Sequence, residues 1–144
     1  MSERDITLYI VDILLAINKI ERYTDQFNNA EEFLHSELEW DASIRELQII
    51  GDATSIILKH QLIDNSYRRI VDFRNQITHG YFGIDEQIVW DVITKKIQQF
   101  KIDLMQVTKL NKINLTDAIE SAIKENYYNE KAVTFLLELK NTLS

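Results

Sequence analysis

The stretch ITLYIVDILLAINKI, residues 6–20, decides the fold class of this chain. Its isoleucine and leucine residues recur at steps of three and four, which places them on one face of an α-helix. The pattern predicts a helix from about residue 4 to 24. The whole sequence holds no proline and only three glycines. Because long helices tolerate such a composition and turn-rich β proteins do not, we predict an all-α protein.

The same helical periodicity continues through most of the chain, and it predicts four more helices. Asn29 followed by Glu32 forms a capping-box pattern, which opens the next helix. The predicted helices run from Ala30 to Leu38, from an Asp41 cap to about His60, from Tyr67 to about His79 after a Ser66 cap, and from an Asp85 cap through Val107. With short connections, the five helices form an antiparallel bundle over residues 1–108.

Residues 109–144 are predicted to form a C-terminal helical extension. The segment LNKIN, residues 110–114, reads as a linker, and Asn114 or Thr116 can cap the next helix. The rest is one further helix or a helical pair. The extension is either a helix added to the bundle or an element for oligomerisation, and both alternatives stay open.

Composition excludes several classes of protein. The chain has 144 residues, enough for one domain, and no cysteine, so disulfides, thiolate metal sites and cysteine nucleophiles are excluded. Its first residues carry acids and bases before any apolar run, unlike a signal peptide. No apolar run approaches the ~20 residues that span a bilayer. We therefore expect a cytoplasmic protein with no membrane contact.

The net charge of −7 is concentrated in one segment. Residues 21–52 hold nine acidic residues against Arg22 and Arg45. This segment is either a solvated helix face or a docking surface for a basic partner. Because a protein with this negative charge repels bulk nucleic acid, a nucleic-acid function requires a local basic site. The only cluster of arginines is Arg68, Arg69 and Arg74.

The stretch RNQITHGYFGID, residues 74–85, holds the candidate site. Gly80 suits a left-handed helix cap, so the helix should end near His79. There the helix dipole favours the protonated imidazole. On a straight helix Arg74 and His79 lie roughly 140° and ~7.5 Å apart, whereas Asn75 and His79 share one face.

An imidazole that moves a proton and a guanidinium that holds a phosphate together suit phosphodiester chemistry. Two plainer interpretations compete with that one. The histidine can simply cap the helix end, and the arginine can form a surface ion pair with Asp72 or Asp85.

The chain resembles the HepT-like branch of the HEPN superfamily, small all-α proteins encoded beside a minimal nucleotidyltransferase. That branch is marked by arginine, four residues, histidine, one residue and tyrosine, which here are Arg74, His79 and Tyr81. The resemblance covers about residues 5–107 and includes YIVDILLAINKIERYT (9–24), EEFL (31–34), RELQIIGDA (45–53) and RRIVDFRNQITHGYFGIDEQIVWDV (68–92). Two features depart from the family. Asn65, Ser66 and Tyr67 stand where proline and tryptophan are usual, and Asp52 replaces a more common glutamate.

The resemblance implies a toxin that is a metal-independent RNA endonuclease without a cofactor. Two protomers would pair so that Arg74 of one and His79 of the other share a cleft. There the 2′-hydroxyl of RNA attacks the adjacent phosphate. Asn75, one turn before His79, could orient the imidazole or be a plain exposed residue. Whether Asp52 takes part stays open.

The resemblance also implies a protein partner. The neighbouring nucleotidyltransferase of the MNT type acts as antitoxin by AMPylating the motif tyrosine, here Tyr81. The added phosphate would repel and block RNA. Gly80 and Gly83 would let the loop present the hydroxyl. The plainer interpretation is that Tyr81 packs beside Phe82.

Other residues carry weaker signals. His35 and His60 lack metal-ligand partners at useful spacing and are predicted to be surface residues. Trp40 and Trp90 are predicted to be core or partner-facing anchors. No glycine-rich phosphate loop is present, so ATP would belong to the partner. The competing function is a non-catalytic accessory or substrate-binding subunit of a nucleotidyltransferase, favoured by the acidity. A bundle with no site fits the Arg-His-Tyr pattern poorly.

Overall fold

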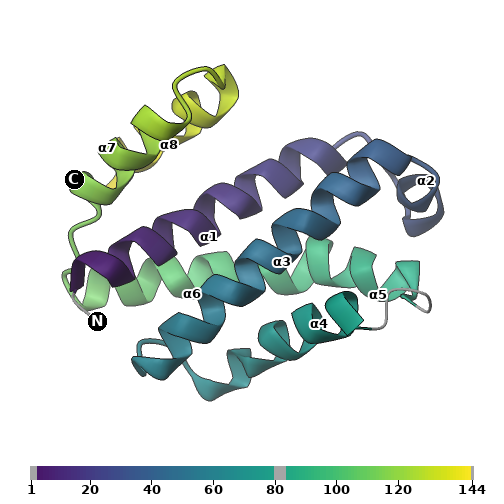
Figure 1. The fold of residues 1–144 in the computed structure, drawn as a ribbon, viewed down its shortest axis with the longest axis horizontal. Helices are drawn as coiled ribbons and strands as arrows, with labels where there is room; N and C mark the ends of the chain where they lie inside the picture. Colours follow the sequence, from purple (N-terminus) through teal and green to yellow (C-terminus); the bar gives the residue numbers. More distant parts are fainter. Residues whose placement is uncertain (1–2, 80–83, 144) are drawn as a thin grey trace.

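The computed structural model describes residues 3–79 and 84–143, and these residues form only helices, turns and loops, which confirms the all-α prediction (Figure 1). The elements in chain order are α1 (Glu3–Thr24), α2 (Ala30–Leu34), α3 (Glu37–Lys59), the 3-10 turn η1 (Asn65–Tyr67), α4 (Arg68–His79), α5 (Glu86–Asp91), the π-helical segment η3 (Val92–Lys96), α6 (Ile97–Leu110), α7 (Thr116–Glu125) and α8 (Glu130–Leu143).

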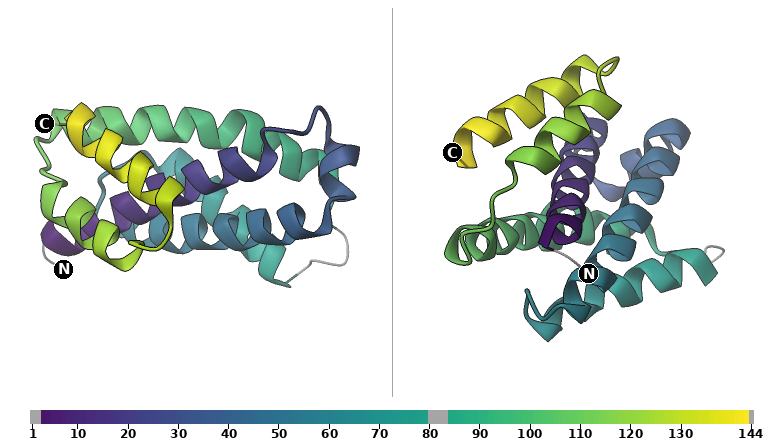
Figure 2. Two further views of the ribbon diagram at one scale, coloured as in Figure 1. Left: turned by 90° about the horizontal axis from the view of Figure 1, so that it is seen from above. Right: turned by 60° about the vertical axis from the view of Figure 1, so that its left-hand side comes forward.

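Helix α1 lies at the centre of the core. Its stripe of Ile10, Ile13, Ile17 and Ile20 is fully buried. Helix α3 runs antiparallel beside α1, and α6 also packs on α1. Helix α4 lies along α3 (Figures 1 and 2). Burial of each such side chain stabilises the fold by about 1.5–3 kcal/mol. The stretch that set the fold class therefore forms the centre of the bundle.

The second and third predicted helices have different boundaries in the structure. Asn29 caps α2 as predicted, because its Oδ1 accepts from the Glu32 backbone N–H at 2.9 Å. However, α2 ends at Leu34 and not at Leu38. Helix α3 begins at Glu37, so the Asp41 cap was wrong.

Ser36 and Glu39 form a second pair at the spacing of Asn29 and Glu32. Ser36 is the N-cap residue of α3, and its carbonyl accepts the first helical bond, from Trp40 N–H at 2.9 Å. Its hydroxyl donates to Glu39 Oε2 at 2.7 Å. This hydrogen bond lowers the pKa of Glu39. The N-cap of α3 therefore lies earlier in the chain than predicted, with Ser36 held by the Glu39 side chain and not by a side-chain bond to the helix backbone.

The start of the motif helix also differs from the prediction. Asp64 makes the cap, because its Oδ1 accepts from the Ser66 backbone N–H at 2.8 Å, so the Ser66 cap was wrong. Tyr67 stacks on Phe100 with ring centroids 4.7 Å apart, and its hydroxyl donates to Asp103 of α6. The tyrosine therefore anchors the first turn of α4 to α6.

The fifth predicted helix is one rod built from α5, η3 and α6. Asp85 caps it as predicted, accepting from the Gln87 backbone N–H at 2.8 Å. Within the rod, η3 has the wider turn of a π-helix. The wider turn lets Val92, Ile93 and Ile97 all be buried, while the residues between them face solvent.

The C-terminal extension forms a pair of helices that packs on α1, on the side away from α4 (Figures 1 and 2). The N-cap residue of α7 is Leu115, so the predicted cap at Asn114 or Thr116 was wrong by one residue, although Asn114 Oδ1 accepts from the Thr116 N–H at 2.9 Å. Leu115, Ile119 and Leu136 are buried in the same core cluster as α1. The extension is thus the predicted helical pair. A role in oligomerisation and a domain boundary near residue 108 stay predictions.

Most residues of the acidic segment lie on the surface, but Glu46 does not. Its exposed fraction is 6%, and burial raises its pKa above the ordinary value of 4.5, opposed by Lys19, Arg45 and Arg22. For this residue the solvated-face interpretation was wrong. The periodic position of Glu46 on α3 turns it toward α1.

The remaining aromatic and histidine predictions are confirmed. Trp40 and Trp90 both pack on buried Phe33, with ring centroids 4.9 and 5.8 Å away, so they anchor the core. His35 and His60 are exposed. Within the described ranges, no helix combines the length and apolar composition needed to cross a membrane.

Candidate functional site

The site begins where α4 crosses α3 at Gly51. A Cβ atom added at Gly51 would lie 2.6 Å from Arg74 Cγ, far inside van der Waals contact. Only a residue without a side chain allows the stem of Arg74 to lie this close to α3. Gly51 therefore sets the position of Arg74, and the sequence analysis missed this role. The signal was present, since Gly51 is the first of the three glycines in the chain and interrupts a helical pattern.

Three polar contacts hold the guanidinium of Arg74. Its Nε donates to Asp52 Oδ1 at 2.6 Å, and Nη2 forms an ion pair with the same oxygen. Its Nη1 donates to Asn75 Oδ1 at 2.6 Å. The Arg74 side chain keeps 33% of its surface exposed. Because a guanidinium carries five N–H donors, some stay available for a phosphate.

These contacts answer one question raised by the sequence, the identity of the carboxylate that pairs with Arg74. Arg74 does pair with a carboxylate, but the partner is Asp52 and not Asp72 or Asp85. The prediction that Asn75 orients His79 stays untested, and the contact seen for Asn75 is with Arg74. Asp52 and Asn75 thus hold the arginine from two sides.

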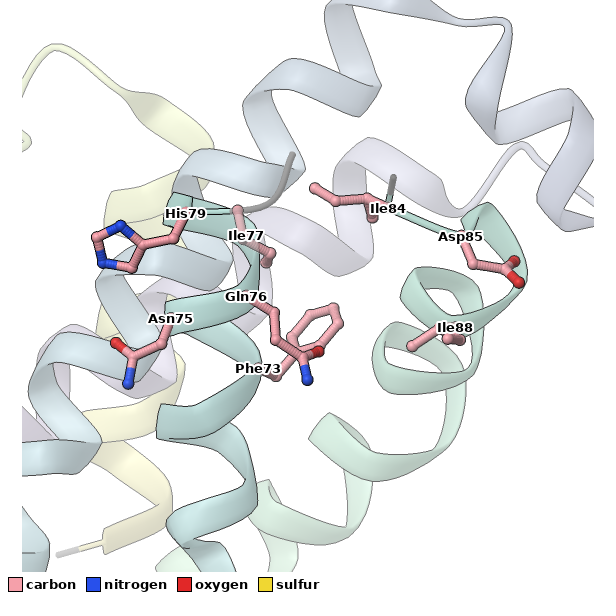
Figure 3. Close-up of a pocket in the computed structure, with 8 residues that line it drawn as sticks. All are labelled: Phe73, Asn75, Gln76, Ile77, His79, Ile84, Asp85 and Ile88. Atoms are coloured by element: carbon pink, nitrogen blue, oxygen red, sulfur yellow. The ribbon is translucent and has the colours of Figure 1, made fainter. Parts of the chain in front are cut away.

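His79 is the last residue of α4 and is exposed. Figure 3 shows that His79 and Asn75 project from one side of α4, whereas Phe73 and Gln76 project toward α5. The structure therefore gives the imidazole a solvent-facing position at the end of the helix that carries Arg74. We call Arg74 with its partners Asp52 and Asn75 the Arg74 clamp. Gly80, Tyr81 and Gly83 lie outside the described residues, so the predictions for them stay predictions.

A pocket of about 530 Å³ lies between α4 and α5 (Figure 3). Its walls are mostly apolar, from Phe73, Ile84 and Ile88, and its rim includes Asn75 and His79. Over residues 3–79 and 84–143, no group of three or more histidine or acidic side chains is placed to hold a metal ion.

Fold and site together define a class: a small helical bundle that presents an exposed histidine and a clamped arginine at one helix end. The family model described as "Ribonuclease HepT-like" matches residues 13–107 of this chain. The chain therefore belongs to the HepT-like family of the HEPN superfamily, as its resemblance suggested. The match includes Gly51, Asp52, Arg74 and His79, and it ends before α7.

Individual relatives agree with the family match. A Methanocaldococcus jannaschii protein named "Putative RNase" is 30% identical over 104 residues, which are 70% of this chain and 94% of that protein. A Thermococcus cleftensis protein named "Probable ribonuclease HepT" is 32% identical over 96 residues, 65% of this chain and 86% of that protein. No solved structure matches this chain.

Proposed function

We propose that this protein is a metal-independent RNA endonuclease, the toxin of a toxin–antitoxin pair. The observation that carries the proposal is that α4 of a HepT-like family member bears both the Arg74 guanidinium held by Asp52 and Asn75 and, at its exposed end, His79. Asp52 and Asn75 fix the guanidinium before substrate arrives. A preorganised cation of this kind stabilises developing phosphate charge at little reorganisation cost.

The chemical steps of RNA cleavage can be assigned to the imidazole of His79 and the guanidinium of Arg74. The 2′-oxygen of the ribose bonds to phosphorus, while the bond from phosphorus to the 5′-oxygen breaks. His79 accepts the proton of the 2′-hydroxyl and a protonated imidazole delivers one to the leaving 5′-oxygen. Arg74 neutralises the charge on the phosphoryl oxygens. The products are a 2′,3′-cyclic phosphate and a 5′-hydroxyl end.

The proposed active unit is a homodimer. Arg74 and His79 are five positions apart on α4, roughly 140° around the helix, so one chain does not aim both groups at one point. A second copy facing the end of α4 brings its own His79 to the first Arg74. The exposed positions of Asn75 and His79 leave that side of α4 open for such pairing.

Regulation is proposed to act at Tyr81. In this proposal a nucleotidyltransferase of the MNT type transfers AMP to the hydroxyl of Tyr81. Tyr81 follows His79 by two residues, so the adduct brings a phosphate to the point where RNA is cut. The negative adduct competes for Arg74 and repels the RNA backbone.

Growth and RNA mapping test the proposal. Cells express the wild type, His79→Ala or Tyr81→Phe, alone or with a co-expressed nucleotidyltransferase, and RNA ends are mapped. We expect the wild type to arrest growth and to leave RNA with 5′-hydroxyl ends. The purified protein should cut RNA equally well when a metal chelator is present. His79→Ala should cut about 10²–10⁴-fold more slowly. Tyr81→Phe should stay toxic beside the nucleotidyltransferase that rescues the wild type.

The second candidate function is a non-catalytic accessory subunit of a nucleotidyltransferase. The net charge of −7 favours it, because an acidic protein binds nucleic acid poorly. Equal growth and intact RNA with wild type and His79→Ala would support this candidate. Purifying both proteins in parallel controls for cleavage by a trace nuclease contaminant.

A further inference from the structure

The pocket beside His79 continues as a groove along α4. Phe73, Gln76 and Ile88 line both this pocket and a second one of about 270 Å³. The second pocket ends at Arg69 of α4 and Lys96 of η3. We call the two together the α4 groove; Figure 3 shows the part near His79. The groove thus joins the candidate site to two cations that are far apart in sequence.

The basic end of the α4 groove is unusual for so acidic a chain. Arg68, Arg69, Lys95 and Lys96 are all exposed, and none has an ion pair or hydrogen bond with another side chain of the described residues. One carboxylate, Asp72, lines the same pocket. The sequence showed only the arginine cluster, whereas the fold brings Lys96 to the same pocket as Arg69.

The burial pattern around η3 places the lysines on the surface. Val92, Ile93 and Ile97 are buried, and the three residues between Ile93 and Ile97, which include Lys95 and Lys96, are exposed. π-helical segments of this kind occur often at functional sites.

We propose that the α4 groove binds a single-stranded stretch of RNA next to the bond that is cut. Arg69 and Lys96 hold a phosphate, Phe73 offers a ring face for a base, and the Gln76 amide reaches a base edge. Arg69 lies ten positions before His79, or about 15 Å along α4, a span of a few nucleotides. The proposal rests on the proposed nuclease function and specifies its substrate as single-stranded.

Charge favours RNA over a second copy of the chain as occupant. Arg69 and Lys96 are exposed and line one end of the groove, and such a cationic end attracts a polyanion. Two copies meeting through this groove by two-fold symmetry would bring the same cations toward each other. Aromatic rings beside cations are the usual platform for single-stranded nucleic acid, because every base has a stacking face.

Binding of an uncut RNA tests the groove. The probe is a fluorescent 2′-O-methyl RNA of about 12 nucleotides, a length that single-strand-binding folds cover. This RNA lacks the attacking hydroxyl. Anisotropy is measured against salt for the full chain, for Arg69→Ala/Lys96→Ala, and for Gln76→Ala. The matched control is Lys124→Ala/Lys131→Ala, which removes two exposed cations from α7 and α8.

We expect the groove double variant to bind roughly tenfold more weakly. Its slope of log affinity against log salt should shrink by about 0.7, since Arg69 and Lys96 hold one phosphate and each single-strand phosphate contact contributes about 0.7. Gln76→Ala should bind a few-fold more weakly with an unchanged slope. The control should match the wild type.

Three other outcomes decide the matter. If the groove double variant binds like the wild type while the wild type cuts RNA, the groove proposal is overturned and the nuclease function stands. If the variant loses binding while the wild type cuts no RNA, the groove stands and the nuclease function fails. If sedimentation shows that the variant changes from dimer to monomer, the groove is a contact between copies, and the proposal is overturned.

Discussion

Helix α4 and the α7–α8 pair are held to the bundle by different kinds of contact. Among the described residues, α4 buries only Val71 and Ile77, and polar contacts of Tyr67 and Arg74 tie it to its neighbours. The α7–α8 pair instead buries an apolar stripe on α1. Apolar burial stabilises the fold, whereas exposed polar contacts contribute little to stability but aim side chains. The comparison indicates that the α7–α8 pair serves stability, whereas α4 serves to position the side chains of the candidate site.

Removal of Leu136 should give the largest loss of stability. This side chain of α8 is fully buried. Leu136→Ala leaves a cavity and should lower the free energy of unfolding by about 2–5 kcal/mol. The matched control is Leu137→Ala, because Leu137 is 47% exposed on the same helix. Urea denaturation measures both, and an equal, small loss in the two variants would contradict the structural role of the extension.

Gly51→Ala should lower both the stability of the fold and the activity of the candidate site. An added Cβ meets the stem of Arg74, so α3 and α4 must separate or the arginine must move. We expect a loss of about 1–3 kcal/mol in stability, together with reduced RNA cleavage. In an ordinary helix interior the same change stabilises by roughly 0.5–1 kcal/mol. Thermal denaturation showing stabilisation of that size would refute the close approach.

Asp52→Asn should reduce RNA cleavage while leaving the stability of the fold almost unchanged. The ion pair with Arg74 is solvent-exposed, so its loss should lower stability by no more than about 1 kcal/mol. Cleavage should fall roughly tenfold, mainly in kcat, because a misplaced guanidinium no longer meets the developing charge.

Two controls make this test specific. Asp52→Glu keeps the charge and should restore most of the activity. Asp41→Asn, an exposed acid of the same helix, should change nothing. Equal rates for Asp52→Asn and the wild type would remove Asp52 from the site.

Glu46→Gln should give the smallest effect, and its sign depends on pH. Burial raises the pKa of Glu46, so the folded state favours the protonated carboxyl. The contribution of that carboxyl to stability is therefore present at pH below its ordinary value of 4.5 and is lost as pH rises through the raised value. The glutamine variant should gain stability relative to the wild type between acidic and neutral pH. Parallel denaturation curves at both pH values measure the difference.

The sequence predicted what depends on local pattern. Apolar residues at steps of three and four gave the helices, and the cap at Asn29 was correct because its glutamate partner is three residues away. The start of α3 failed because two candidate caps, Ser36 and Asp41, compete within six positions. The family was identified because its motif is short and contiguous.

The sequence did not predict what depends on contacts between distant residues. Arg74 has several acids within reach along the chain, and only the crossing of α4 over Gly51 selects Asp52. Arg69 and Lys96 line one groove only because the fold brings α4 and η3, which are separate in the sequence, to the same pocket. Periodicity carries no information about which helices become neighbours.

The π-helical segment has a consequence for the phase of the α5–α6 rod. Each residue added to or removed from a helix rotates everything beyond it by about 100°. A π-helical turn holds one residue more than an α-helical turn. A chain lacking one residue between Val92 and Lys96 can therefore close this segment into ordinary α-helix and keep Phe100 and Leu104, both fully buried, facing the core. A deletion within α6 has no such slack and would turn the residues beyond it away from the core, so the middle of the rod is where the loss of a residue is best tolerated.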